Sequence, residues 1–140
     1  MFSSRRKLRV LVVDDDAKFT ELLTVLLGTD PRLSVIASAA DGAEGVELAV
    51  RLRPDVVVMD VEMPVLDGIA AARRIRRRLR GTRVVLVSGG ADPQLGGRAL
   101  AAGAEAFVRK DGGLQALLDI VAARERTTPA FASAVTLSAA

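Results

Sequence analysis

The chain has 140 residues, half of them hydrophobic, with 20 basic and 17 acidic side chains and a formal net charge of +3. It contains no cysteine and no histidine, which excludes disulfides, imidazole catalysis and the usual zinc ligands, so that any metal site must consist of oxygen ligands. This length predicts one domain, and the absence of a long apolar run or a signal peptide predicts a soluble, cytoplasmic protein without a membrane segment.

Short apolar, largely β-branched runs alternate along the chain with segments whose apolar residues recur at helical spacing. The predicted strands cover residues 8–13, 33–38, 56–59, 83–87 and 105–109. The predicted helices cover residues 17–27, 42–52, 69–79, 91–102 and 114–126. We expect Asp16, Asp41 and Asp67 to be helix N-caps and Gly28 a C-cap. Pro93 and the interior pair Gly96-Gly97 predict a short or labile fourth helix, because each glycine costs about 1 kcal/mol relative to alanine.

Five strand–helix units in succession predict the fold class. Such a pattern is typical of a doubly wound α/β fold with right-handed crossovers and helices on both faces of the sheet. We therefore expect a five-stranded parallel sheet, flavodoxin-like (βα)5, with strand order 2-1-3-4-5. The expected organisation is a basic arm over residues 1–7, a domain over residues 8–126, and a tail or linker over residues 127–140.

Polar side chains stand where four of the predicted strands end. Asp14 and Asp15 follow the first strand, Asp60 the third, Ser88 the fourth and Lys110 the last. Because parallel strands end at the same edge of a sheet, where open α/β proteins bind ligands, we expect these side chains to converge. The buried strand before Asp60 makes this carboxylate the expected reactive residue.

The crowded carboxylates predict a cation. Like charges held together cannot all remain ionised without one, and Mg²⁺ (or Mn²⁺) accepts carboxylate, water and phosphate oxygens. The same ion would neutralise a phosphoryl group near Asp60, while Lys110 and Ser88 hold the other phosphoryl oxygens. The chemistry inferred from these residues is phosphoryl transfer onto an aspartate.

Four sequence motifs occur in order around these residues. They are Val-Val-Asp-Asp (12–15), Asp-Val-Val-Val-Met-Asp-Val-Glu-Met-Pro-Val-Leu-Asp-Gly (55–68), Val-Val-Leu-Val-Ser (84–88) and Gly-Ala-Glu-Ala-Phe-Val-Arg-Lys-Asp (103–111). One motif alone would be weak evidence, whereas four in order are strong. From about Leu8 to Arg126 the chain resembles the receiver domains of two-component response regulators.

This resemblance implies roles for the acidic residues. Asp60 would be the phosphoacceptor that attacks the phosphohistidine of a sensor histidine kinase. Asp15 and Asp60 would ligate Mg²⁺ together with the main-chain carbonyl of Glu62, and Asp14 would act through a bound water. The resemblance also allows a homodimer on phosphorylation.

Further residues receive roles from the same resemblance. Ser88 would be the hydroxyl that moves toward the phosphoryl group, and Lys110 its ion partner. Phe107 would be the aromatic switch residue on the face formed by the fourth helix, the fifth strand and the fifth helix. Glu62 and Gly90 lie where the family tunes the lifetime of the phosphoryl group.

The sequence departs from the family pattern after the lysine. Most receivers have a proline there, commonly after a cis bond, whereas Asp111 follows Lys110 in this chain, so that geometry is not assumed. Lys-Asp at this point resembles receivers that precede a LuxR-type helix-turn-helix. Gly89 replaces the usual small residue such as alanine and predicts a looser loop. DNA contact is expected only through an output domain absent from this chain.

Three alternatives to a phosphoacceptor share some of these residues or this fold. A haloacid-dehalogenase-type phosphohydrolase also uses an aspartate, a serine or threonine and a lysine, but it requires Asp-x-Asp-x-Thr or Val where this chain has Asp-Asp-Asp-Ala-Lys (14–18). A flavin-binding protein of the same fold needs backbone donors, not acids, in the first loop. A receiver that serves only as a docking surface has no need of the acids and the lysine. The arginine row over residues 73–80 is expected to be a solvated helix face.

Overall fold

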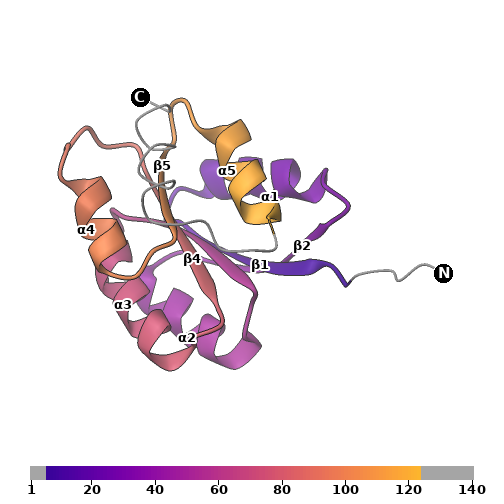
Figure 1. Cartoon of the computed structure of the whole chain (residues 1–140), viewed down its shortest axis with the longest axis horizontal. Helices are drawn as coiled ribbons and strands as arrows, with labels where there is room; N and C mark the ends of the chain where they lie inside the picture. Colours follow the sequence, from indigo (N-terminus) through magenta and orange to yellow (C-terminus); the bar gives the residue numbers. More distant parts are fainter. Residues whose placement is uncertain (1–5, 124–140) are drawn as a thin grey trace.

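The computed structural model describes residues 6–123, so residues 1–5 of the expected arm and the expected tail lie outside the described part. Its elements in chain order are β1 (Leu8–Val13), α1 (Ala17–Gly28), β2 (Leu33–Ala39), α2 (Gly42–Leu52), β3 (Val56–Asp60), α3 (Gly68–Arg78), β4 (Arg83–Ser88), α4 (Leu95–Ala101), β5 (Ala106–Arg109) and α5 (Leu114–Ala122) (Figure 1). Within these residues no helix has the length and apolar character needed to cross a membrane.

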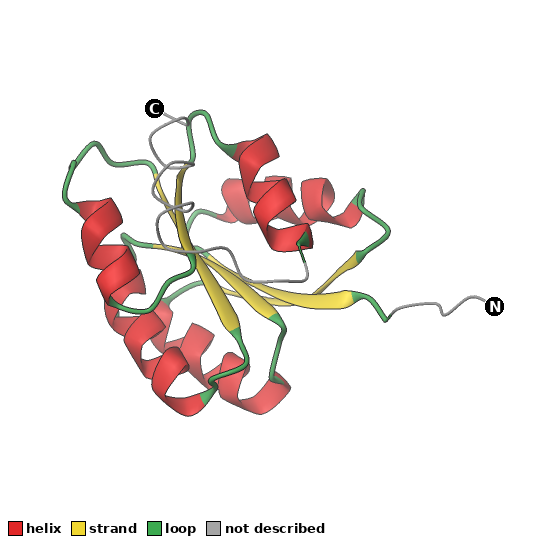
Figure 2. Cartoon of the chain, viewed as in Figure 1, coloured by secondary structure: helices red, strands yellow, loops and turns green. Residues whose placement is uncertain are grey.

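The five strands form one parallel sheet in the order β2-β1-β3-β4-β5. The central strand β3 pairs with β1 on one side and β4 on the other, with Val58 opposite Val12 and Val85. Helices lie on both faces of the sheet, as Figure 2 shows. The predicted fold class and strand order are therefore confirmed.

Two hydrophobic cores, one on each face of the sheet, explain why the strands are apolar throughout. In β3, Val57 and Met59 point into the core beneath α2, α3 and α4, whereas Val56 and Val58 point into the core beneath α1 and α5. Successive side chains of a strand point to opposite faces, so a strand covered on both sides must be apolar at every position. This requirement holds until Asp60, where the strand reaches the edge of the sheet.

The expected N-caps are confirmed, whereas some of the predicted helix ends are wrong. Gly28 is the last residue of α1 and not its C-cap; the C-cap is Thr29, whose N–H and hydroxyl both bond the carbonyl of Leu26. Helix α5 ends at Ala122, because Ala123 has an extended backbone (φ −69°, ψ 135°), and residues 124–126 of the predicted helix lie outside the described part.

Helix α4 begins at Leu95 and not at residue 91, so the predicted start is wrong, whereas its length of seven residues, without a side-chain N-cap, confirms the expectation of a short helix. The segment before Leu95 is irregular and contains Pro93, and the glycine pair stands in the first turn. Proline and glycine both weaken a helix, so the helix starts only after Pro93 and stays short.

Gly68 sets the position of the acidic edge. Its N–H donates to the carbonyl of Val61, and a Cβ added to it would lie 2.1 Å from the carbonyl oxygen of Asp60. Only glycine permits this close approach of backbones. Helix α3 therefore starts directly against the end of β3 and fixes the loop that follows Asp60.

Candidate functional site

Carboxylates from two adjacent strands meet at the carboxyl edge of the sheet. Asp14 and Asp15 follow β1, Asp60 ends β3, and one carboxylate oxygen of each lies within 4.8 Å of the others. Asp14 and Asp60 are buried, whereas Asp15 is exposed to solvent. Asp14 is fixed by its own loop, because its Oδ1 accepts a hydrogen bond of 2.8 Å from the N–H of Asp16.

Lys110 extends from the end of β5 toward two of these acids. Its Nζ forms ion pairs with both, lying 2.9 Å from Asp14 Oδ2 and 3.6 Å from Asp60 Oδ1. Burial disfavours the ammonium, but the contacts with Asp14 and Asp60 outweigh it and raise the pKa of Lys110. Nζ also lies 4.4 Å from the ring centroid of Phe19 in α1, which adds a cation–π contact.

The carboxylate of Asp60 is poorly satisfied by the described residues. Burial, followed by the negative charge of Asp14, raises the pKa of Asp60 to about 6, although Lys110 acts in the opposite direction. Its Oδ1 is buried and accepts no hydrogen bond within residues 6–123. A buried acceptor without a partner costs free energy, so this oxygen has unused capacity for a cation or a donor.

These residues fit a hard divalent cation. Each of the three acids offers a carboxylate oxygen within 4.8 Å of the others, and two buried oxygens of these acids, Asp14 Oδ2 and Asp60 Oδ1, have no hydrogen-bond partner among residues 6–123. Such a group matches the oxygen ligands that Mg²⁺ or Mn²⁺ prefers. Exposed Asp15 leaves one side of the group open for water and for an incoming ligand. A depression of about 320 Å³ adjoins Asp14 and Asp15 on the side of α1 and α2.

Ser88, at the end of β4, binds the side chain of Glu62, a contact that the sequence does not predict. Its hydroxyl donates a 2.7 Å hydrogen bond to Oε1 of Glu62 and accepts one of 2.9 Å from the N–H of Gly90. A Cβ on Gly90 would lie 2.5 Å from Glu62 Oε2. The glycine therefore provides the space in which the Glu62 carboxylate reaches Ser88.

The remaining predicted residues lie around this group. Phe107 is buried in the core beneath α3 and α4. No cis peptide bond occurs among the described residues, including the bond between Lys110 and Asp111. Asp111 forms an ion pair of 3.2 Å with Arg109, and a Cβ on Gly89 would make only an ordinary contact with Lys110.

Two contacts could not be predicted from the sequence. The sequence gives the Glu62 side chain no hydrogen-bond partner, and it predicts Phe19 only as part of the apolar face of a helix. The one available signal for Phe19 is its position one helical turn after Asp15, which brings it near the acidic edge.

Comparison with known proteins identifies relatives of this chain. The sequence matches the family model of the response regulator receiver domain over residues 10–122. A protein-glutamate methylesterase/protein-glutamine glutaminase from Symbiobacterium thermophilum is 48% identical over 113 residues, which is 78% of this chain and 30% of that protein. The chain thus spans about a third or less of such curated relatives.

Solved structures give the same result. The response regulator domain of Thermotoga maritima CheB is 36% identical, with a TM-score of 0.77 and coverage of 83% of this chain and 94% of that one. A two-component response regulator of the LuxR family from Aurantimonas sp. SI85-9A1 is 27% identical, with a TM-score of 0.81 and coverage of 94% and 96%. The chain is therefore similar to receivers of both kinds.

Proposed function

The chain belongs to the response regulator receiver domain family, and on this premise we propose that it accepts a phosphoryl group from a sensor histidine kinase onto Asp60. The observation that carries the proposal is the group formed by the three carboxylates and Lys110, in which Asp60 Oδ1 has no hydrogen-bond partner among residues 6–123. A pKa of about 6 leaves Asp60 mostly ionised at neutral pH and therefore nucleophilic.

The proposed step is an in-line displacement at phosphorus. A carboxylate oxygen of Asp60 forms the new P–O bond, the P–N bond to the kinase imidazole breaks, and the imidazole leaves with the electron pair and takes a proton from solvent. Lys110 holds one phosphoryl oxygen electrostatically, and the hydroxyl of Ser88 donates to another. The domain thus catalyses its own phosphorylation and does not turn over a substrate.

Asp14, Asp15, Asp60 and the main-chain carbonyl of Glu62 are the proposed holders of Mg²⁺, with Asp14 acting through a water. When bound, the ion neutralises the carboxylates and the charge on the transferred group. Mn²⁺ satisfies the same oxygen ligands.

The hydrogen bond between Ser88 and Glu62 supports a switch. In this structure the hydroxyl is committed to Glu62, so it must leave that carboxylate in order to donate to a phosphoryl group. We propose that this movement, together with a change at Phe107, alters the face formed by α4, β5 and α5. A homodimer formed through this face on phosphorylation belongs to the same proposal.

The output of the switch depends on what accompanies the receiver. The curated methylesterase relatives carry most of their length outside the matched region. The chain is also similar to a receiver of the LuxR family. We therefore propose that this receiver controls a separate output activity, an esterase-type or a DNA-binding one, in the cytoplasm. DNA contact would then be made by the output domain.

Acetyl phosphate with Mg²⁺ tests the proposal. Intact-mass measurement should show the addition of one phosphate, peptide mapping should locate it at Asp60, and EDTA or Asp60→Asn should abolish it. Asp16→Asn is a matched control that keeps the N-cap and should be labelled normally. Labelling that survives in Asp60→Asn, or turnover of a generic phosphatase substrate by the wild type, would favour the hydrolase alternative.

A further inference from the structure

Positive charge is concentrated in one part of the chain. Residues 68–104 contain eight arginines and a single acidic residue, Asp92, so in a chain of net charge +3 the remainder is net negative. Such asymmetry creates a field that steers charged partners toward one face. Six of the eight arginines lie in α3 or within two residues of its end.

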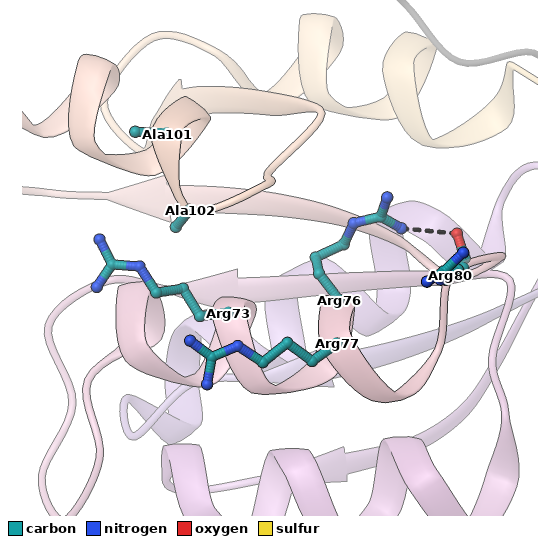
Figure 3. Close-up of a pocket in the computed structure, with 6 residues that line it drawn as sticks. All are labelled: Arg73, Arg76, Arg77, Arg80, Ala101 and Ala102. Atoms are coloured by element: carbon teal, nitrogen blue, oxygen red, sulfur yellow. Dashed lines mark hydrogen bonds between the residues drawn. The ribbon is translucent and has the colours of Figure 1, made fainter.

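Four of these arginines border one groove between α3 and α4. The groove has a volume of about 500 Å³, and its lining residues, shown in Figure 3, are Arg73, Arg76, Arg77, Arg80, Ala101 and Ala102. All the charged lining residues come from α3 and the turn that follows it, whereas α4 contributes only small side chains. One wall of the groove is therefore cationic, and the other leaves room for an incoming side chain.

The arginines of the wall differ in how they are held. Arg76 is half-buried and donates hydrogen bonds of 2.8 Å to the carbonyls of Arg80 and Thr82. Arg73 and Arg77 are exposed, and neither forms an ion pair with a carboxylate in residues 6–123. The guanidinium of Arg76 is thus fixed by hydrogen bonds, whereas the charges of Arg73 and Arg77 are not neutralised by any acid of the described residues.

We propose that this groove binds an acidic α-helical segment of a partner protein. Arg73 and Arg77 follow the spacing i, i+4 in α3 and lie about 6 Å apart along its axis, and Arg80 follows in the turn beyond the end of the helix. A partner helix with Asp or Glu at the same spacing presents a matching row of carboxylates, and guanidinium groups bind carboxylates through two parallel hydrogen bonds.

Other anionic ligands fit the groove less well. No aromatic side chain lines it, so a nucleotide base or a single-stranded nucleic acid has nothing on which to stack. The large hydrophobic residues that are exposed in the described part are Leu22, Val25 and Val65, all outside the groove, which leaves no apolar group there to enter a lipid surface. The arginines along α3 are best matched by acidic side chains along a second helix.

A pair of charge reversals in the full-length chain tests the proposal. The probe is a helical, alanine-based peptide with glutamates at i, i+4 and i+7, and binding is followed by fluorescence anisotropy at low and moderate salt. Arg73→Glu/Arg77→Glu should weaken binding roughly tenfold or more, since each reversal replaces an attraction by a repulsion. The matched control is Arg74→Glu/Arg78→Glu, which makes the same charge change at the same spacing on the same helix but outside the groove. This control should weaken peptide binding less than threefold, because only the long-range electrostatic attraction is reduced.

Circular dichroism and labelling at Asp60 confirm that both variants are folded. An equal loss in the two variants would show general attraction to a basic helix and overturn the proposal, as would absence of binding to the wild type. Tripolyphosphate and a short DNA duplex are separate probes. Tighter binding of either one, lost selectively in Arg73→Glu/Arg77→Glu, would assign the groove to a phosphate ligand instead.

Discussion

At the scale of single residues, the same crowding that prepares Asp60 for chemistry weakens the fold. Its folded pKa of about 6 lies above the unfolded value of 3.8, because burial and the charge of Asp14 disfavour the carboxylate. The folded state therefore binds the proton more tightly than the unfolded state. Consequently, the free energy of unfolding falls as pH rises from about 4 to about 6, and the loss is complete above that window.

Asp60→Asn should therefore stabilise the metal-free protein. The amide cannot ionise, so in EDTA at pH 7.5 we expect a gain on the order of 1–2 kcal/mol that shrinks toward zero near pH 4. Urea unfolding at several pH values measures this difference. A stability difference that does not change between pH 4 and pH 7.5 would show that the crowded charge is not its cause.

Gly90→Ala tests the restraint on Ser88. The new Cβ would lie 2.5 Å from Glu62 Oε2, so the flexible carboxylate must move and release the serine hydroxyl. Acetyl phosphate labelling should become about twofold to tenfold faster, corresponding to a lost hydrogen bond of 0.5–1.5 kcal/mol.

Glu62→Ala is the matched comparison, because it removes the same hydrogen bond without adding an atom at residue 90. It should accelerate labelling to a similar extent. If both variants are labelled at the rate of the wild type, the bond to Glu62 does not restrain Ser88.

What the sequence predicts at this scale follows from strand ends. Asp14, Asp60 and Lys110 each follow an apolar run, so their convergence is a consequence of parallel topology alone. The contacts of Glu62 and Phe19 depend instead on side-chain conformations and on the exact height of α1 and the loop after β3. The periodicity of the sequence does not predict these side-chain conformations or positions.

At the scale of elements, a glycine in α4 and a glycine in the turn after it differ in whether they can be replaced by alanine. Gly97 lies in the helix with nothing within 4 Å of an added Cβ, whereas Gly103 has φ +99° and would place a Cβ 3.0 Å from Cγ of Arg76. Gly97→Ala should stabilise the protein by about 0.5–1 kcal/mol, mainly by restricting the unfolded chain. Gly103→Ala should destabilise it by about 1–3 kcal/mol.

Thermal unfolding of the two variants measures both effects, with Gly28→Ala as a comparison at the end of α1, where an added Cβ also has open space. Destabilisation by Gly97→Ala would mean that the glycine at this position has a role in the native state. An unchanged stability in Gly103→Ala would mean that the turn adopts another conformation.

The ends of elements illustrate why sequence patterns predict some boundaries and not others. Asp16, Asp41 and Asp67 are local signals, because an N-cap bonds N–H groups two or three residues away. The end of α5 has no such signal. Its last carbonyls are bound by Arg83, which is about forty residues earlier in the chain, so this boundary is set by tertiary contacts.

At the scale of the whole molecule, the apolar strands imply helices on both faces, and with five alternating units the fold follows from pattern and right-handed crossovers. The concentration of arginine between residues 68 and 104 is also visible in the sequence. The sequence does not show that four of these arginines border a groove, because the groove depends on the distance between α3 and α4.

A buried ion pair joins β4, β5 and α5 at the edge of the sheet opposite the acidic group. Arg83, at the start of β4, contacts Glu105, directly before β5, with Nη2 and Oε1 2.8 Å apart and exposed side-chain fractions of 6% and 3%. The same guanidinium donates hydrogen bonds of 2.6 Å to the carbonyls of Ile120 and Ala123 at the end of α5. Arg83 thus connects both strands to the last helix.

Removal of one partner should be costly because it leaves the other charge buried and unpaired. We expect Arg83→Met and Glu105→Gln each to lower the free energy of unfolding by about 3–5 kcal/mol. The double variant Arg83→Met/Glu105→Gln should lose at least about 1 kcal/mol less than the sum, since no unpaired charge remains in it. Urea unfolding of the four proteins in this cycle measures the coupling.

The exposed pair of Arg109 and Asp111, at the other end of β5, is the matched control. These two residues have the same charges as the buried pair, but their side chains are 24% and 64% exposed. Arg109→Met should therefore cost no more than about 1 kcal/mol. If it costs as much as Arg83→Met, burial is not what makes the Arg83 pair important, and attachment of α5 must then rest on its apolar contacts with β4 and β5.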